Sequence, residues 1–241
     1  HQNNVRKRLE ETAREQTQTP ADYTESHTLI RALYYSSKTN IVPMSSLEEL
    51  MEKARMLHAE GHPTGQIADE LSLSTDTITW MLTQGKNTAS APKDVHIDWT
   101  TVSSDATLLS GIASMLMVNF ENCCDEDEEI DAVVGVDAAG IPLATLMAAE
   151  HGLNLAIYHP SKHNADTNCG SISGNFSKVT GKRCIIVDDC ITTGNTLAEI
   201  VTYLRRHKAH PAGICVLFDK RGVREIEGVP VYPLFSVKRI D

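Results

Sequence analysis

Between Ser46 and Glu60, apolar residues recur every three or four positions, which is the spacing of a helix with one buried face. Ser46 and Glu49 stand three residues apart, the reciprocal capping pattern that satisfies free amides at a helix start. Gly61 to Pro63 end the run. The pattern predicts a helix of about four turns over this segment.

The second half of the chain alternates short apolar runs with longer amphipathic segments. The apolar runs predict buried strands, and the amphipathic segments predict helices. This alternation is typical of an α/β fold in which helices cover both faces of a parallel sheet. The predicted helices are Ala106–Phe120, Ile141–Glu150 and Thr196–His207, and the predicted strands are Ala132–Val136, Leu153–His159, Cys184–Val187, Ala212–Phe218 and Val229–Leu234.

A polar, proline-containing segment, Asn87–Trp99, separates the two patterns and indicates a linker. Met44 has the character of a translation start, so we expect the polar residues before it to be an upstream extension. The predicted organisation is an extension of residues 1–43, a small all-α domain of residues 44–86, a linker of residues 87–103 and an α/β domain of residues 104–241.

The composition constrains what the protein binds. The net charge of −10 opposes non-specific attraction to DNA and to anionic membranes. Residues 44–86 carry three basic and seven acidic side chains, so any DNA binding there works against the local charge. No apolar run approaches the roughly 20 residues that span a bilayer. We expect a cytoplasmic protein without a membrane partner.

The six cysteines do not show the spacing of metal ligands. Cys184, Cys190 and Cys215 lie in or beside apolar runs, where thiols pack as small hydrophobic groups. A metal or redox protein therefore has no support in the sequence.

The segment CIIVDDCITTGNT, Cys184–Thr196, carries the clearest candidate site. In parallel sheets, ligands bind where strands end and helices begin. The turn after this strand offers free amides, hydroxyl groups and the positive end of the helix dipole, which suit a phosphate. The residues of this turn are Thr192, Thr193, Gly194, Asn195 and Thr196. Asp188 and Asp189 repel a phosphate and suit sugar hydroxyls or a hydrated magnesium ion. The segment predicts a ribose 5-phosphate site; the alternative is a capped strand-to-helix connection without a ligand.

This segment resembles the PRPP-binding signature of type I phosphoribosyltransferases, with Cys190 as a departure from the usual aliphatic residue or serine. The resemblance implies that Asp188 and Asp189 bind the ribose hydroxyls, that Thr192 to Thr196 surround the 5-phosphate, and that magnesium is bound through PRPP and not directly by the protein.

A second segment, Gly135–Glu150, resembles the pyrophosphate loop of orotate phosphoribosyltransferases. Its small residues form a turn after a predicted strand, where backbone amides approach a second anion. The candidate ligand-binding residues here are Asp137, Ala138, Ala139 and Gly140.

Two features depart from an orotate enzyme. Lys162 and His163 stand where the mobile cationic loop of that family begins, but the basic cluster that follows is absent from Pro160–Arg183. This segment is either a lid or a plain surface loop. Where those enzymes use an arginine for the orotate carboxylate, this chain has Lys220 followed by Arg221, and either residue could serve. Lysine lacks the bidentate fork, so orotate specificity does not follow. We expect PRPP binding with transferase activity weak or lost.

The segment Thr64–Lys86 has the spacing of a helix-turn-helix, with Ser72 in place of the usual turn glycine. In this motif the second helix enters the major groove of DNA. The candidate DNA-binding residues are Ser74, Thr75, Asp76, Thr77, Thr79, Gln84 and Lys86. The alternative is a helical hairpin used for packing or dimerisation.

From Met44 onward the chain is similar to archaeal transcription regulators of the GfcR type, which join a helix-turn-helix to an orotate phosphoribosyltransferase-like domain. The resemblance implies a homodimer, or a higher homo-oligomer, that binds a DNA operator and responds to PRPP or a related phosphosugar. The alternative function is an active phosphoribosyltransferase for orotate or a purine, with the helical domain used for oligomerisation.

Overall fold

The computed structural model describes residues 47–83, 92–124, 129–163 and 170–238. All of them belong to one compact unit, residues 44–241. The predicted extension of residues 1–43, the capping residue Ser46 and the candidate DNA-binding residues Gln84 and Lys86 lie outside the described residues.

Three helices form the small all-α domain: α3 (Leu47–Ala59), α4 (Thr64–Glu70) and α5 (Thr75–Thr83). They share a hydrophobic core to which each contributes, including Ala54 of α3, Ile67 of α4 and Ile78 of α5, all fully buried. The helical spacing in the sequence is thereby confirmed for residues 47–83. We call residues 47–83 the helical domain.

The turn between α4 and α5 reverses the chain within four residues. Ser72 adopts a φ of +49°, the left-handed conformation that favours glycine. The amides of Ser72 and Leu73 donate to the carbonyls of Asp69 and Ala68, which closes the end of α4. A serine in this conformation costs about 1 kcal/mol relative to glycine, so other contacts must compensate.

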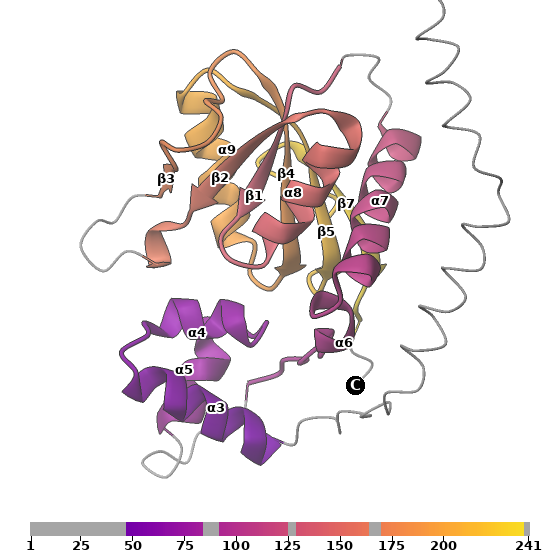
Figure 1. The fold of residues 1–241 in the computed structure, drawn as a ribbon. Helices are drawn as coiled ribbons and strands as arrows, with labels where there is room; N and C mark the ends of the chain where they lie inside the picture. The colour runs from indigo at the N-terminus through magenta and orange to yellow at the C-terminus, as the bar shows by residue number, and fades with distance from the viewer. Residues whose placement is uncertain (1–46, 84–91, 125–128, 164–169, 239–241) are drawn as a thin grey trace, which may run out of the picture. The chain divides into compact units, whose positions relative to one another are not determined.

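The α/β domain is built on a seven-stranded sheet in the order β3-β2-β1-β4-β5-β7-β6 (Figure 1). The five central strands run parallel, and the two short edge strands pair antiparallel. The strands are β1 (Ala132–Val136), β2 (Asn154–His159), β3 (Ser171–Ile172), β4 (Arg183–Ile191), β5 (His210–Asp219), β6 (Glu225–Ile226) and β7 (Val229–Ser236). The predicted parallel sheet is confirmed.

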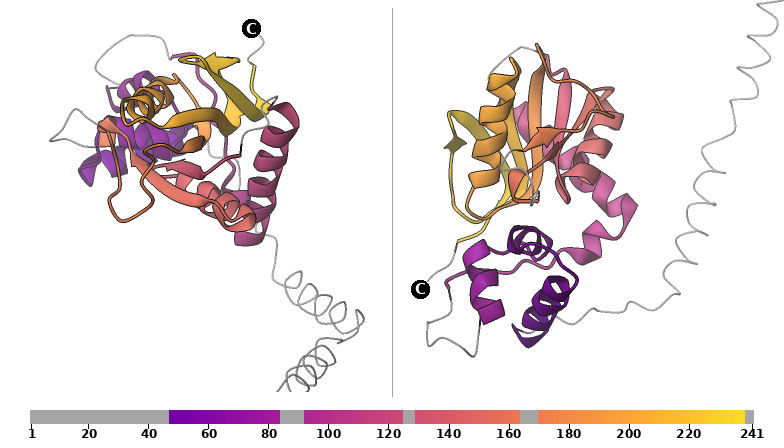
Figure 2. Two further views of the ribbon diagram at one scale, coloured as in Figure 1. Left: turned by 90° about the horizontal axis from the view of Figure 1, so that it is seen from above. Right: turned by 90° about the vertical axis from the view of Figure 1, so that its left-hand side faces the viewer.

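Helices cover both faces of this sheet (Figure 2). On one face, α7 (Ala106–Cys123) and α8 (Gly140–His151) pack on strand residues such as Val133 and Ile185. On the other face, α9 (Asn195–Arg206) packs on their neighbours Val134 and Ile186. Because successive strand residues face opposite sides, each apolar run supplies both cores. The short helix α6 (Thr100–Ser103) precedes α7.

The prediction was wrong about where β4 ends. The sequence suggested that the strand stops at Val187, because two aspartates follow. In the structure β4 continues to Ile191, and its last residues pair with Phe218 and Asp219 of β5. Backbone pairing extends the strand although its side chains turn polar. The edge strands β3 and β6 were not predicted, since each contains only two residues.

Candidate functional site

A cavity of about 540 Å³ lies at the carboxyl ends of β1 and β4, where ligands bind in parallel sheets. Most of the candidate ligand-binding residues line it together: Asp137, Ala138, Ala139, Asp188, Asp189, Thr192, Thr193, Gly194 and Thr196, with the candidate lid residues Lys162 and His163. Gly140, Asn195 and Lys220 are not among the lining residues. The helical domain also contributes to the wall, through Asp69 and Ser72.

Asp188 and Asp189 place two carboxylates in this cavity on consecutive residues of β4. The amide of Asp189 donates to Oδ1 of Asp188 at 2.9 Å, and Oδ2 of Asp189 accepts from the Ser72 hydroxyl at 3.2 Å. Burial, reinforced by the carboxylates of Asp189 and Asp69, raises the pKa of Asp188 well above its usual value. Burial also raises the pKa of Asp189, against the hydrogen bond from Ser72. Both groups are suited to accept hydrogen bonds from a neutral polyol or to face a cation.

The turn from β4 into α9 presents its backbone to the cavity. Gly194 has a φ of +80°, and a side chain there would meet the Arg221 guanidinium at 2.8 Å. Arg221 donates to the carbonyl of Thr193, which holds the turn from outside. Gly194, at the start of α9, makes no side-chain cap, and the Thr193 hydroxyl accepts from the amide of Asn195 at 3.4 Å. The first amides of that helix, where the dipole is positive, therefore face the cavity as an anion site requires.

The turn between β1 and α8 forms the opposite wall. Oδ2 of Asp137 lies 2.9 Å from Nδ1 of His159, at the end of β2. A side chain on Gly140 would lie 2.3 Å from the carbonyl oxygen of Val187. Gly140 therefore lets the start of α8 approach the backbone of β4, and this packing explains the glycine without a ligand.

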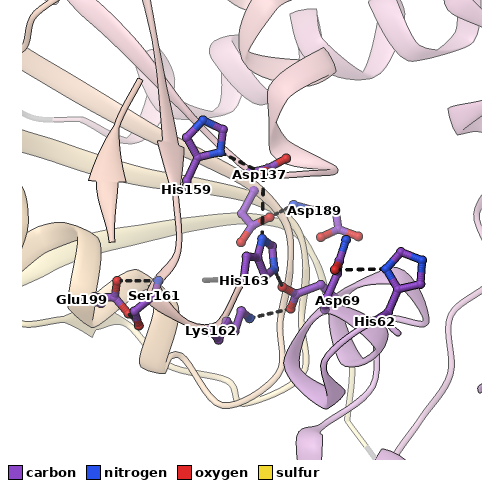
Figure 3. Close-up of polar contacts among 11 residues, drawn as sticks. His62, Asp69, Asp137, His159, Ser161, Lys162, His163, Asp189 and Glu199 are labelled. Atoms are coloured by element: carbon purple, nitrogen blue, oxygen red, sulfur yellow. Dashed lines mark hydrogen bonds and ion pairs between the residues drawn. The ribbon is translucent and has the colours of Figure 1, made fainter. Parts of the chain in front are cut away.

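Lys162 and His163 lie in a short 3₁₀ turn, η1 (Ser161–His163), and both contact Asp69 of α4 (Figure 3). Nζ of Lys162 lies 2.5 Å from Oδ1 of Asp69, and Nε2 of His163 lies 2.6 Å from Oδ2. The Lys162 ammonium group and the His163 ring thus share one carboxylate, with one oxygen for each.

Glu199 of α9 fixes the start of that turn. Its carboxylate accepts from the amide of Ser161 at 3.0 Å and from the hydroxyl of Ser161 at 2.6 Å (Figure 3). It also accepts from the hydroxyl of Tyr158 at 2.8 Å. Burial, followed by the hydrogen bond to Glu199, raises the pKa of Tyr158, so this phenol stays a donor. The position of η1 is therefore set within the α/β domain.

Lys220 does not line the cavity, and its ammonium group has partners elsewhere. Its Nζ lies 2.6 Å from Oδ1 of Asp94 and donates to the Ser72 carbonyl at 2.9 Å. Its side chain is 7% exposed. The ammonium group is therefore committed to the linker and to the turn of the helical domain.

Some of the candidate DNA-binding residues are exposed on α5, and others hold the start of that helix. Thr75, Asp76 and Thr79 are exposed on α5. Thr77 is only 5% exposed, and its hydroxyl donates to Oδ2 of Asp94 at 2.9 Å. The amide of Ser74 donates to the same oxygen at 2.7 Å. Asp94 thus caps α5, and Thr77 belongs to this cap and not to the exposed face.

Sequence reasoning missed Asp69, Ser72, Asp94, His159 and Glu199. His159 ends a predicted parallel strand, a position that could have identified it. The others act across long separations, such as the 117 residues between Ser72 and Asp189, and carry no local signal.

The described residues contain no group of three or more His, Cys, Asp or Glu side chains that fits a metal ion. Among the described residues, no helix has the length and apolar character to cross a membrane.

Comparisons with known proteins identify a domain family and several relatives of the chain. The family model named Phosphoribosyl transferase domain matches residues 107–238. The chain is 73% identical to Transcriptional regulator GfcR of Methanocorpusculum labreanum over 198 residues, which cover 82% of this chain and all of that protein. It is 58% identical, with the same coverage, to the protein of that name in Methanosphaerula palustris.

Solved structures support the fold of the α/β domain. The adenine phosphoribosyltransferase of Thermoanaerobacter pseudethanolicus aligns with a TM-score of 0.50 at 16% identity, over 61% of this chain and 91% of that one. The enzyme of Saccharomyces cerevisiae aligns with a TM-score of 0.50 at 19% identity, over 62% and 90%. At such identities the likeness concerns the fold alone, and it confirms the predicted type I phosphoribosyltransferase fold.

Proposed function

Because this chain belongs to the GfcR family of transcriptional regulators, we propose that it is a DNA-binding regulator whose phosphoribosyltransferase-like domain binds PRPP, or a related phosphosugar, as its effector. One observation carries the proposal. The loops expected to hold the phosphosugar and residues of the helical domain line the same cavity. A ligand there changes contacts of the helical domain directly.

The effector lies, in this proposal, with its 5-phosphate at the amides of Thr192 to Thr196 and its ribose hydroxyls at Asp188 and Asp189. The start of α9 provides positive potential for the phosphate, and the aspartates accept from the hydroxyl groups. Magnesium accompanies PRPP and is held mainly by the ligand, since magnesium prefers oxygen donors and keeps several waters.

The helical domain binds DNA through α5, with Thr75, Asp76 and Thr79 toward the bases. Ser74 and Thr77 hold the start of that helix. A homodimer doubles these contacts on a two-fold operator, as it does for helix-turn-helix regulators in general. Such a regulator works in the cytoplasm, where the chromosome is.

Lys220 favours a regulator over an orotate transferase. The ammonium group that would meet the orotate carboxylate is held in a buried pair with Asp94.

The test begins with operator selection. The full chain is used to retrieve binding sites from a random-sequence DNA library, and affinity for the selected site is measured with and without PRPP and magnesium. We expect PRPP to change the affinity by at least fivefold. Identical affinities would refute PRPP as the effector, and failure to select any site would refute DNA binding.

Two matched variants test the role of α5. The hydroxyls of Thr79 and Thr83 each donate to the carbonyl four residues earlier at 2.8 Å, so Ala substitution removes the same local bond from both. We expect Thr79→Ala to weaken operator binding at least fivefold and Thr83→Ala, one turn further from the helix start, to change it less than twofold. Equal effects would argue against base contact by Thr79.

Phosphorus NMR separates the regulator from the enzyme. PRPP and magnesium are mixed with the protein, and orotate, adenine, guanine, hypoxanthine and uracil are added in turn. We expect shifted or broadened PRPP signals without growth of pyrophosphate. Pyrophosphate that grows only when a base is present would make the protein a transferase.

A further inference from the structure

Asp69 places a carboxylate from the helical domain where an effector anion would bind. Its two oxygens contact the Lys162 ammonium group and the His163 ring of η1. His163 is only 12% exposed, and its other ring nitrogen lies 3.8 Å from Asp137. The anionic partner of Lys162 and His163 is therefore the Asp69 carboxylate of α4. A ligand anion can bind these two donors only by replacing Asp69.

Ser72 makes a parallel contact one turn further along the chain. Its hydroxyl donates to Oδ2 of Asp189, one of the two carboxylates expected to receive the ribose hydroxyls. The helical domain thus offers a carboxylate to the cations and a hydroxyl to the aspartates. A phosphorylated sugar likewise presents an anionic group and hydroxyls, with a phosphate in place of the carboxylate.

The cations stay in place without Asp69, because Glu199 anchors η1 through both Ser161 groups. Gly65 allows α4 to lie against the turn, since a side chain there would lie 3.1 Å from Cβ of Lys162. The contact is therefore a close docking of α4 on a turn that is fixed independently. Release of α4 leaves the two cations available to a ligand.

Electrostatics make this docking easy to displace. Asp69 shares the cavity with Asp137, Asp188 and Asp189. Burial raises the pKa of both Asp188 and Asp189, and charge repulsion from the Asp69 carboxylate adds to the increase. Like charges in a partly buried site disfavour one another. Lys162 and His163 compensate this repulsion, so a ligand that takes those cations removes the main reason for Asp69 to remain.

We propose that the edge of α4 mimics the effector. In the absence of the effector, Asp69 holds the side chains of Lys162 and His163, and an anionic group of the bound phosphosugar replaces Asp69 and releases α4. The inference rests on the proposed function and specifies how that site is regulated. Since ligand and α4 compete for the same donors, the ligand binds the released form more tightly, which is the differential affinity that coupling requires.

Calorimetric titration of Mg·PRPP into the full chain tests the competition. Asp69→Asn removes the competing charge, and Glu60→Gln removes one charge from an exposed residue of the same domain that does not line the cavity. We expect Asp69→Asn to bind PRPP at least fivefold more tightly than the wild type and Glu60→Gln to bind within twofold of it. Equal affinities of the two variants would overturn the proposal.

A double-mutant cycle of Asp69→Asn and Lys162→Met tests the competition in a way that does not depend on the folding of a single variant. In the wild type Asp69 already occupies Lys162, so we expect the loss of Lys162 to weaken PRPP binding at least fivefold more in the Asp69→Asn background than in the wild type. Equal losses in both backgrounds would show that Asp69 does not withhold this cation, and would overturn the proposal.

Operator binding provides the last readout. PRPP should change operator affinity in the wild type and in Glu60→Gln, and by less than twofold in Asp69→Asn. A full response in Asp69→Asn would refute α4 release as the coupling step. If neither the wild type nor Asp69→Asn binds PRPP at millimolar concentration, the proposed effector itself is wrong, whereas PRPP binding without the Asp69 effect refutes only the mimicry.

Discussion

Nζ of Lys220 lies 2.6 Å from Oδ1 of Asp94, and the two side chains are 7% and 10% exposed. The same aspartate caps α5 through the amide of Ser74 and the hydroxyl of Thr77. One buried ion pair therefore joins the end of β5, the linker and the start of α5.

Lys220→Met should destabilise the protein by about 3 kcal/mol, because it leaves the Asp94 carboxylate buried without its cation. Urea unfolding at neutral pH measures the loss. Lys238→Met is the control, since Lys238 is exposed, and its effect should stay within about 0.5 kcal/mol. A loss for Lys220→Met as small as the control's would mean that the pair contributes nothing.

Asp188 should reduce stability at neutral pH. Folding raises its pKa, through burial and the neighbouring carboxylates, so the protonated form is favoured in the folded state. Its contribution is therefore favourable at low pH and is lost as the pH rises through the folded-state pKa. Asp188→Asn should unfold at higher urea than the wild type at pH 8, by about 1 to 2 kcal/mol.

The pH dependence of that difference is the sharper measurement. The gain for Asp188→Asn should shrink as the pH falls and approach zero only below about pH 3, where Asp188 is protonated in both the folded and the unfolded state. Asp76→Asn, at an exposed position in the first turn of α5, should show no such gain at pH 8. A gain for Asp188→Asn that is independent of pH would refute the electrostatic explanation.

Gly140 and Gly111 form a matched pair for one substitution. An alanine at 140 puts its Cβ 2.3 Å from the carbonyl oxygen of Val187, whereas at 111, on the exposed side of α7, nothing lies within 4 Å. Gly140→Ala should cost about 1 to 3 kcal/mol through overpacking. Gly111→Ala should be neutral or stabilise by up to about 1 kcal/mol through helix propensity. Thermal unfolding of both variants checks the contrast.

The described cysteines should differ widely in reactivity. Burial raises the pKa of Cys184 to about 12 and also raises that of Cys190 and Cys215, so their thiols stay protonated. Cys123 is exposed. Iodoacetamide at pH 8 followed by peptide mapping should label Cys123 in the native protein, and label Cys184 and Cys215 only after unfolding. Early labelling of Cys215 would contradict its burial.

Much of the fold was predictable because apolar alternation records which residues face a core. The runs at β1, β2 and β5 and the periodic segments at α7, α8 and α9 satisfy that condition. The end of β4 was not predictable, because its last residues are held by backbone pairing to β5 and their side chains are polar.

The candidate site divides in the same way. Asp188, Asp189 and the turn after them were visible because they follow a strand within a few residues. Asp69 and Asp94 were not, because their partners Lys162 and Lys220 come from distant parts of the chain and a lone aspartate in a polar segment has no distinctive spacing. For Lys220 the sequence indicated a ligand contact, and the structure places it in an ion pair.

The left-handed Ser72 limits how freely the helical domain can be exchanged between proteins. Its hydroxyl donates to Asp189 of β4, and its carbonyl accepts from Lys220, which follows β5. A transplanted domain with the common turn glycine would relieve the backbone and keep the carbonyl contact, yet lose the hydroxyl. Chimaeras built by joining a foreign DNA-reading domain at the linker would then recognise a new operator while their response to the ligand is altered.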